Sequence, residues 1–118
     1  MSELKTGSEL TPVARKEGDA LIVSVRGEID LQNSPELRTE LIDLLAKHSP
    51  NRVVLNLTQV PYMDSSAIAV LVELLQKVRK TEGKVYLTNL QPRVKGLLEI
   101  ARLGSIFGIV NDEAEAMK

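Results

Sequence analysis

The sequence predicts a single α/β domain with a mixed, mainly parallel sheet of four to five strands, an N-terminal antiparallel hairpin and helices packed against the sheet. Short β-branched runs alternate along the chain with longer amphipathic segments, and this alternation is typical of βαβ units. The length of 118 residues suits one compact domain and is short for two. We therefore expect one domain over residues 10–118, preceded by a flexible arm at residues 1–9.

The first two expected strands form the hairpin. Residues 11–15 and 20–26 are separated by a polar link that contains Gly18 and suits a connection between antiparallel strands. Within the second strand, alternate residues from Leu21 to Val25 are apolar. Because side chains alternate between the two faces of a sheet, these residues should share one buried face.

The first long helix should follow a polar loop at residues 27–33. Ser34 offers an N-cap hydroxyl, and Pro35 is favourable at the first helical position. Apolar residues then recur at helical spacing as far as Leu45, and the Ser49-Pro50 pair ends the segment. The pattern predicts an amphipathic helix that begins at Ser34.

The second half of the chain repeats the alternation of strand and helix. A β-branched run at residues 52–57 predicts a buried strand, and apolar spacing from Ser65 to Lys80 predicts a second long helix ended by Gly83. The remaining expected elements are a strand at 84–90, a helix at 92–101, a short edge strand at 106–110 and a terminal helix at 111–117.

Composition argues against several kinds of site. Fifteen basic residues against sixteen acidic ones, without a block of either sign, give no reason to expect binding to nucleic acid. The chain has no cysteine, and the single His48 has no acidic or histidine neighbour at ligand spacing, so we expect neither a metal nor a cofactor. No apolar run approaches the roughly 20 residues that span a bilayer. We expect a cytoplasmic protein that does not insert into a membrane.

The stretch most informative about function is Asp64-Ser65-Ser66, at the start of the second long helix. One side-chain acceptor is enough to cap a helix, yet two hydroxyls follow the acid, and Ser66 has little evident use for the helix. The stretch also follows a parallel strand, at the sheet edge where α/β domains usually keep their sites. In addition, residues 67–72 form an apolar run wider than one core stripe, which predicts that Val70 or Val72 is exposed.

A helix N-terminus is also a favourable place for a phosphate, because its free amides and dipole attract negative charge. Phosphorylation of Ser65 would therefore leave the helix intact. The added charge of roughly −1.5 to −2 would oppose any partner that presents acidic or apolar surface there. We interpret Ser65 as a switch for binding, with simple helix capping as the alternative.

Five short motifs, taken in their order along the chain, carry a family resemblance. They are Arg26-Gly27-Glu28-Ile29-Asp30, Val53-Val54-Leu55-Asn56-Leu57, Met63-Asp64-Ser65-Ser66, Val94-Lys95-Gly96-Leu97-Leu98 and Ile106-Phe107. Together they resemble the STAS domains, and within that family the free-standing anti-sigma-factor antagonists of bacteria. The resemblance extends over nearly the whole chain and implies a STAS-like fold. One difference is that Ala67-Ile68-Ala69 stands where the family usually has Gly-Leu-Gly.

The resemblance further implies a regulator of transcription that works by partner switching and is not an enzyme. Its partner would be an anti-sigma factor that is also a serine-protein kinase, and binding would release the sigma factor. Phosphorylation of Ser65 by that kinase would abolish binding, and a phosphatase of the PP2C type would restore it. The residues expected to meet the partner lie in the polar loop and at the start of the second long helix: Asp30, Asn33, Asp64, Ser66, Ala69 and Val70.

Two other functions stay open at this point. The domain could be the cytoplasmic STAS subunit of a lipid or anion transporter, which would use the same helix. A small nucleotide-binding or hydrolytic domain is a weaker alternative, because the chain has neither a G-x-x-x-x-G-K-[ST] loop nor a G-x-S-x-G elbow.

Overall fold

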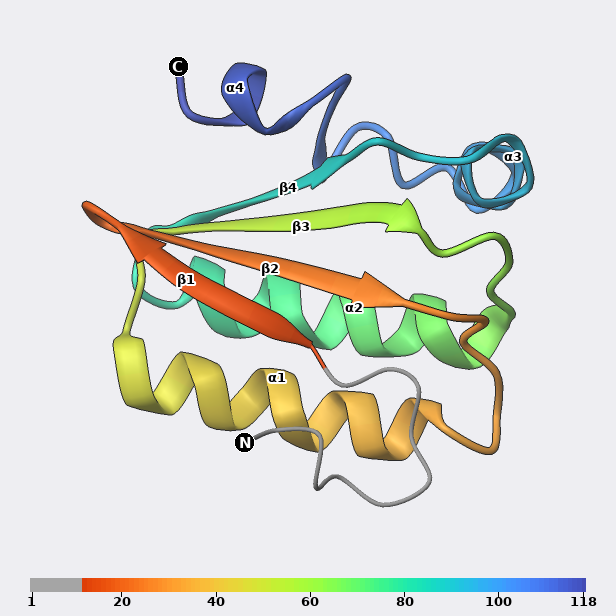
Figure 1. The fold of residues 1–118 in the computed structure, drawn as a ribbon, viewed down its shortest axis with the longest axis horizontal. Helices are drawn as coiled ribbons and strands as arrows, with labels where there is room; N and C mark the ends of the chain where they lie inside the picture. Colours follow the sequence, from red (N-terminus) through yellow and green to blue (C-terminus); the bar gives the residue numbers. More distant parts are fainter. Residues whose placement is uncertain (1–11) are drawn as a thin grey trace.

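The computed structural model describes residues 12–118, in which five strands and four helices form layers around one sheet (Figure 1). The strands are β1 (Val13–Glu17), β2 (Ala20–Arg26), β3 (Arg52–Gln59), β4 (Lys84–Thr88) and β5 (Gly108–Val110). The helices are α1 (Ser34–His48), α2 (Ser65–Arg79), α3 (Pro92–Ile100) and α4 (Glu113–Ala116). The predicted flexible arm at residues 1–9 and the first residues of the expected hairpin lie outside the described range.

The sheet is mixed, as predicted. Its strands lie in the order β1-β2-β3-β4-β5, with β1 antiparallel to β2 and all other neighbours parallel. Helices α1 and α2 lie side by side against one face of the sheet, and α4 lies on the other (Figure 1). The parallel strands therefore have their carboxyl ends at one edge, where the loops into α1, α2 and α3 begin.

The alternation in β2 places its apolar side chains on both faces. Leu21, Val23 and Val25 are buried in the main core under the helices, which confirms the expected shared face. Ile22 faces the opposite side, where it forms a small second core with Val54 and residues of α4. Because β2 and β3 are covered on both sides, each contains a continuous run of buried apolar residues, Ala20–Val23 in β2 and Val53–Leu55 in β3.

Helix α4 is held on the sheet by a polar network centred on Glu113. Its carboxylate accepts hydrogen bonds from Arg15 at 2.6 Å and from Asn56 at 2.7 Å. The bond from Asn56, followed by that from Arg15, holds the pKa of Glu113 below its usual value. Arg52 also donates to the backbone oxygens of Ala116 and Lys118 at 2.7 and 3.2 Å. These bonds fix the last residues of the chain against β1 and β3.

Several expected element ends shift by a few residues. Strand β1 continues to Glu17, so that the hairpin turn is tighter than predicted, with Gly18 at φ +62°. Helix α1 does begin at Ser34, but its N-cap is Asn33, and the expected capping role of Ser34 is wrong. Ser34 is buried at the base of the loop, where its amide donates to the Asp30 carbonyl at 2.8 Å.

Of the two valines named as alternatives for exposure, Val70 is buried and Val72 is partly exposed. The exposed fraction of Val70 is 8%, because α1 packs against this side of α2. Arg38 of α1 and Glu73 of α2 fix that packing with two parallel hydrogen bonds of 2.6 Å. The core face of α2 is thus wider than the predicted stripe, while Val72 remains partly exposed.

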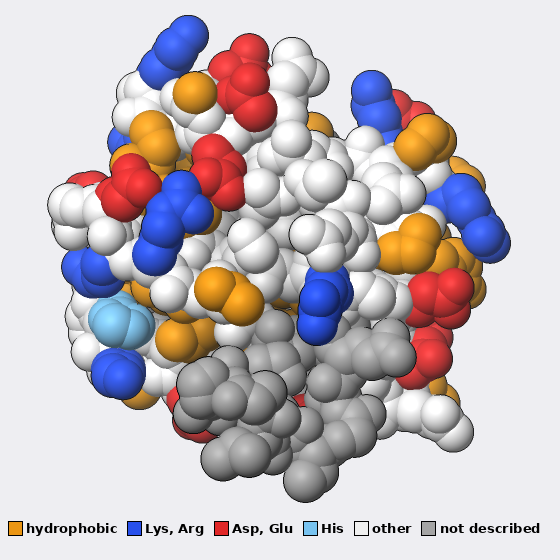
Figure 2. Space-filling view, in the orientation of Figure 1, with side chains coloured by type: hydrophobic (Ala, Val, Ile, Leu, Met, Phe, Trp, Pro, Cys, Tyr) orange, Lys and Arg blue, Asp and Glu red, His pale blue; other side chains and the backbone are white. Residues whose placement is uncertain are grey.

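The surface carries no extended region of one charge on the face in view. Figure 2 shows lysine and arginine side chains interspersed with acidic ones over the described part of this face. Within residues 12–118, no helix has both the length and the apolar character needed to cross a bilayer.

Gly83 is required by close packing and not by a left-handed backbone. The left-handed residue after α2 is Glu82, at φ 63°. A Cβ at Gly83 would lie 2.6 Å from the Asn51 carbonyl oxygen and 2.7 Å from a methyl group of Val78. Gly83 therefore does lie just after α2, close to where the sequence predicted the helix to end. A glycine is needed there because α2 and β4 pack closely against the loop before β3.

We predict opposite effects of alanine at two glycines. Gly83→Ala should lower the free energy of unfolding by about 1–3 kcal/mol, because the methyl group meets the backbone. Gly96→Ala, in α3, is the matched control, since its Cβ would meet nothing within 4 Å. That variant should gain about 0.5–1 kcal/mol from helix propensity. Urea denaturation would measure both, and a Gly83→Ala variant as stable as the parent would contradict the packing argument.

Candidate functional site

Two loops meet at the carboxyl edge of the sheet. The loop from β2 to α1 and the loop from β3 to α2 are joined by a parallel bridge between Ile29 and Met63. The Ile29 amide donates to the Tyr62 carbonyl, and the Asp64 amide donates to the Ile29 carbonyl, both at 3.1 Å. Ile29 and Met63 are buried beneath this junction. The bridge brings Asp30 and Asp64 to one place, as expected for neighbouring parallel strands.

The Asp64 carboxylate links the loop after β2 to the first turn of α2. As N-cap of α2, its Oδ1 accepts from the Ser66 amide at 2.9 Å and from the Ser66 hydroxyl at 2.5 Å. Its Oδ2 accepts from the Leu31 amide in the neighbouring loop at 3.2 Å. These bonds, led by the one from the Ser66 hydroxyl, hold the pKa of Asp64 below its usual value. The carboxylate is charged at neutral pH and stabilises the start of α2.

The two serines differ in what their hydroxyls do. Ser66 holds the capping carboxylate, so the expectation that it has little use for the helix is wrong. Ser65 is exposed, and its hydroxyl has no hydrogen-bond partner among the residues that the structure describes. It stands at the first position of α2, at the positive end of the helix dipole. Of the two hydroxyls, that of Ser65 is the more accessible.

Asp30 and Asn33 bond mainly to their own loop. The Asp30 carboxylate accepts from the amides of Gln32 and Asn33 at 3.0 and 3.2 Å. The Asn33 side chain accepts from the Asp30 amide at 2.8 Å and donates to the Glu28 carbonyl at 2.9 Å. Both residues therefore define the shape of the loop beside Ser65.

The sequence analysis missed Leu31, at the tip of the same loop. Its side chain is 73% exposed, although its amide is held by Asp64. A large apolar side chain presented by an ordered loop next to Ser65 is suited to contact with a partner. The only signal in the sequence was a single leucine within an otherwise polar stretch, and single apolar residues are common in loops.

The two alanines that replace the usual glycines have different surroundings. Ala67 is buried in the core, so its methyl group faces the sheet. Ala69 is exposed one turn after Ser65. Of the two extra methyl groups, that of Ala69 alone lies at the surface.

Residues 12–118 lack the side-chain arrangements typical of a metal site or of a serine hydrolase. No group of three or more histidine, aspartate or glutamate residues there is placed to hold a metal ion. His48 lies in the last turn of α1, whereas Ser65 begins α2, and no hydrogen bond joins them. Within the described chain, the serine has no general base.

Comparison with known proteins gives consistent matches. The STAS domain model matches residues 11–116. The anti-sigma-B factor antagonist of Bacillus subtilis (strain 168) is 35% identical over 97 residues, which cover 82% of this chain and 86% of the relative. An anti-sigma factor antagonist from Mycobacterium paratuberculosis has a similar structure, with a TM-score of 0.81 and 23% identity over 90% of this chain and 89% of that one. The phosphorylated form of the Bacillus cell fate determinant SpoIIAA gives a TM-score of 0.69 at 17% identity, over 90% and 96% of the two chains.

These matches agree with the sequence motifs and with the fold. The motif Arg26-Gly27-Glu28-Ile29-Asp30 forms the end of β2 and the loop after it, and Met63-Asp64-Ser65-Ser66 forms the start of α2, so that the two lie side by side. The family match covers almost all of the described residues. The chain belongs to the STAS domain family.

Proposed function

We propose that this protein is an anti-sigma-factor antagonist switched by phosphorylation of Ser65. In the unphosphorylated state it binds an anti-sigma factor that is also a serine kinase, and this binding releases a sigma factor. The observation that carries the proposal is the Ser65 hydroxyl at the start of α2, which is exposed and has no hydrogen-bond partner in the described part of the chain, beside a Ser66 hydroxyl that is already engaged. The names of relatives such as the Bacillus subtilis anti-sigma-B factor antagonist support the class of partner.

The modification itself is a phosphoryl transfer. The Ser65 oxygen attacks the γ-phosphorus of ATP, the bond from that phosphorus to the bridging oxygen breaks, and ADP leaves with the bond's electron pair. The hydroxyl proton passes to a base of the kinase, since Ser65 has no base of its own among the described residues. A PP2C-type phosphatase would reverse the change by hydrolysis. The phosphorylated form of SpoIIAA, which shares this fold, supports the compatibility of the fold with a phosphate.

The phosphate would act through charge. It would add roughly −1.5 to −2 charges beside Asp64, whose carboxylate is already ionised. The phosphate would lie at the positive end of the α2 dipole, which favours negative charge, so that the helix stays folded. A partner surface that is apolar or acidic at this point would be repelled, because the charge would have to lose its water or face a like charge.

We name the exposed residues around this position the switch surface: Leu31, Ser65 and Ala69. Leu31 offers the apolar contact, Ser65 the modified group and Ala69 a small side chain that permits close approach. Asp30, Asn33, Asp64 and Ser66 support this surface through the hydrogen bonds of the two loops. Val70 is excluded because it is buried.

The first expected result concerns the acceptor. Incubation with the cognate kinase and ATP should place phosphate on Ser65, because its hydroxyl is exposed and Ser66 is held by Asp64. Mass spectrometry of the peptides would locate the group. Ser65→Ala should abolish the modification and Ser66→Ala should retain it, and the reverse result would contradict the assignment.

The second expected result concerns the charge. Ser65→Asp should bind the anti-sigma factor at least about tenfold more weakly than the unphosphorylated parent protein does. The reason is that like charges across an interface cost several kcal/mol. Ser65→Asn, of the same size but neutral, is the matched control and should bind as the parent does. Calorimetric titration would compare the variants, with circular dichroism to verify folding. Equal loss of affinity in both would indicate a steric effect in place of a charge switch.

The third expected result concerns Leu31. Leu31→Asp should weaken partner binding by about tenfold or more, as expected for a central apolar contact, and should change the free energy of unfolding by less than about 0.5 kcal/mol. Ile100→Asp is a matched control, because Ile100 is 82% exposed on α3, away from the switch surface. Titration of both variants against the same partner decides the matter. Unchanged affinity in Leu31→Asp would place the partner elsewhere.

A further inference from the structure

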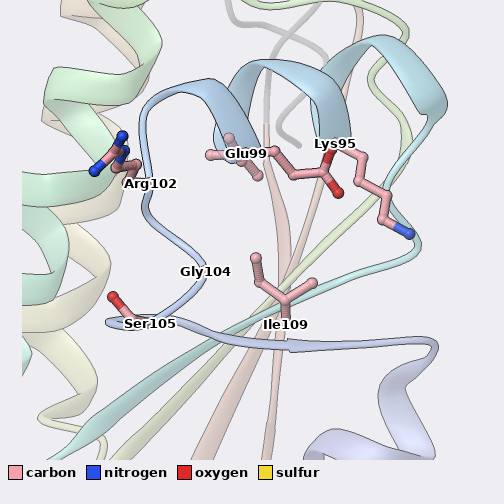
Figure 3. A pocket seen from close by; sticks show the side chains of 7 residues that line it. Lys95, Glu99, Arg102, Gly104, Ser105 and Ile109 are labelled. Carbon is pink, nitrogen blue, oxygen red and sulfur yellow. The ribbon is translucent and has the colours of Figure 1, made fainter.

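A cavity opens between α3 and β5, apart from the switch surface. Its volume is about 400 Å³, and it is bounded by α3, the turn that follows α3, and β5 (Figure 3). This volume lies within the range typical of sites for small molecules. None of its lining residues belongs to the switch surface or to the two loops beneath it. We call it the α3–β5 cavity.

The floor of the α3–β5 cavity is apolar. Leu98 is buried beneath it, and Ile109 of β5 is 36% exposed and points toward α3 (Figure 3). Gly104 leaves space there, because a Cβ at this position would still lie 3.8 Å from the Ile109 terminal methyl group. β5 is an edge strand, so the floor is not covered by a further strand. An aliphatic chain could lie along this floor and be removed from water.

The rim of the cavity carries two cations and one carboxylate. Lys95 and Arg102 lie at its two ends, with Glu99 between them (Figure 3). Within residues 12–118, neither Lys95 nor Arg102 has an ion pair or a side-chain hydrogen bond, in contrast to Arg15 and Arg38. The rim therefore has a net charge of +1, and both of its cations can engage a ligand. Ser105 adds a hydroxyl at the same rim.

We propose that the α3–β5 cavity binds a small amphipathic anion, with one aliphatic chain over Leu98 and Ile109 and a carboxylate head at the rim that carries Lys95 and Arg102. The apolar floor favours ligands with an aliphatic chain, and the two cations favour a negatively charged head group. Glu99 opposes the head group and lowers the affinity. This proposal is independent of the switch at Ser65.

Substitution of Arg102 by glycine can test the role of its charge without backbone strain, because the backbone conformation at this position is one that glycine favours. It has φ 60°, and the Leu103 amide bonds to the Leu98 carbonyl at 3.1 Å, which is the closing pattern of a helix C-terminus. Glycine is the preferred residue at such a position. Arg102→Gly therefore removes the guanidinium group while favouring the native backbone.

The experiment is a titration of the full chain with decanoate below its micelle concentration, followed by amide chemical shifts in ¹⁵N-labelled protein. We expect saturable shifts at Leu98, Ser105 and Ile109, with weaker binding at higher salt. Arg102→Gly and Lys95→Gln should each raise the dissociation constant about two- to fivefold, the size expected for an exposed charge pair. Glu99→Gln should lower it by a similar factor. Ser65→Ala should leave it unchanged.

Three results would overturn the proposal. The first is the absence of saturable shifts at the cavity residues up to the solubility limit of decanoate. The second is equal binding of decyltrimethylammonium with the same response to Glu99→Gln, which would indicate apolar adhesion without selection of charge. The third is binding to vesicles of anionic lipid without binding to free decanoate, which would indicate a membrane surface and no site for a single chain.

Discussion

The candidate site depends on one carboxylate, that of Asp64. It accepts two hydrogen bonds from Ser66 in α2 and one from Leu31 in the loop after β2, and it carries a negative charge at the positive end of a helix. The bond to the Leu31 amide fixes the position of the loop after β2, and the bonds to Ser66 fix the first turn of α2. Because its oxygens bind these donors, the neighbouring Ser65 hydroxyl has no hydrogen-bond partner within residues 12–118.

The sequence predicted the fold class and the order of elements because both follow from local periodicity. The alternation of apolar residues in β2 and the helical spacing in α1 and α2 are properties of short segments. The predictions were wrong where contacts between segments distant in the sequence determine burial or the end of a helix. Val70 is buried because α1 and the Arg38–Glu73 pair cover that side of α2, and no pattern within α2 reveals this. Asn33 replaces Ser34 as N-cap because the Asp30 loop turns one residue earlier.

The position of the candidate site could be predicted from the sequence, but the different roles of its individual residues could not. Asp64-Ser65-Ser66 was recognisable as a helix start after a parallel strand, and the family resemblance singled out Ser65. The difference between the two serines rests on a hydrogen bond of 2.5 Å from Ser66 to Asp64, which only the three-dimensional arrangement provides. Leu31 was missed for a related reason, since its exposure on a loop held by Asp64 is not visible in the sequence.

The position of α4 has a practical consequence for measurement. This helix is fixed by Glu113 and Arg52 on the sheet face opposite α1 and α2, so its exposed residue Ala114 lies on the other side of the sheet from the switch surface. The chain contains no cysteine, and an Ala114→Cys substitution would therefore supply a unique thiol. A fluorophore or a tether for single-molecule work attached there would lie away from the switch surface.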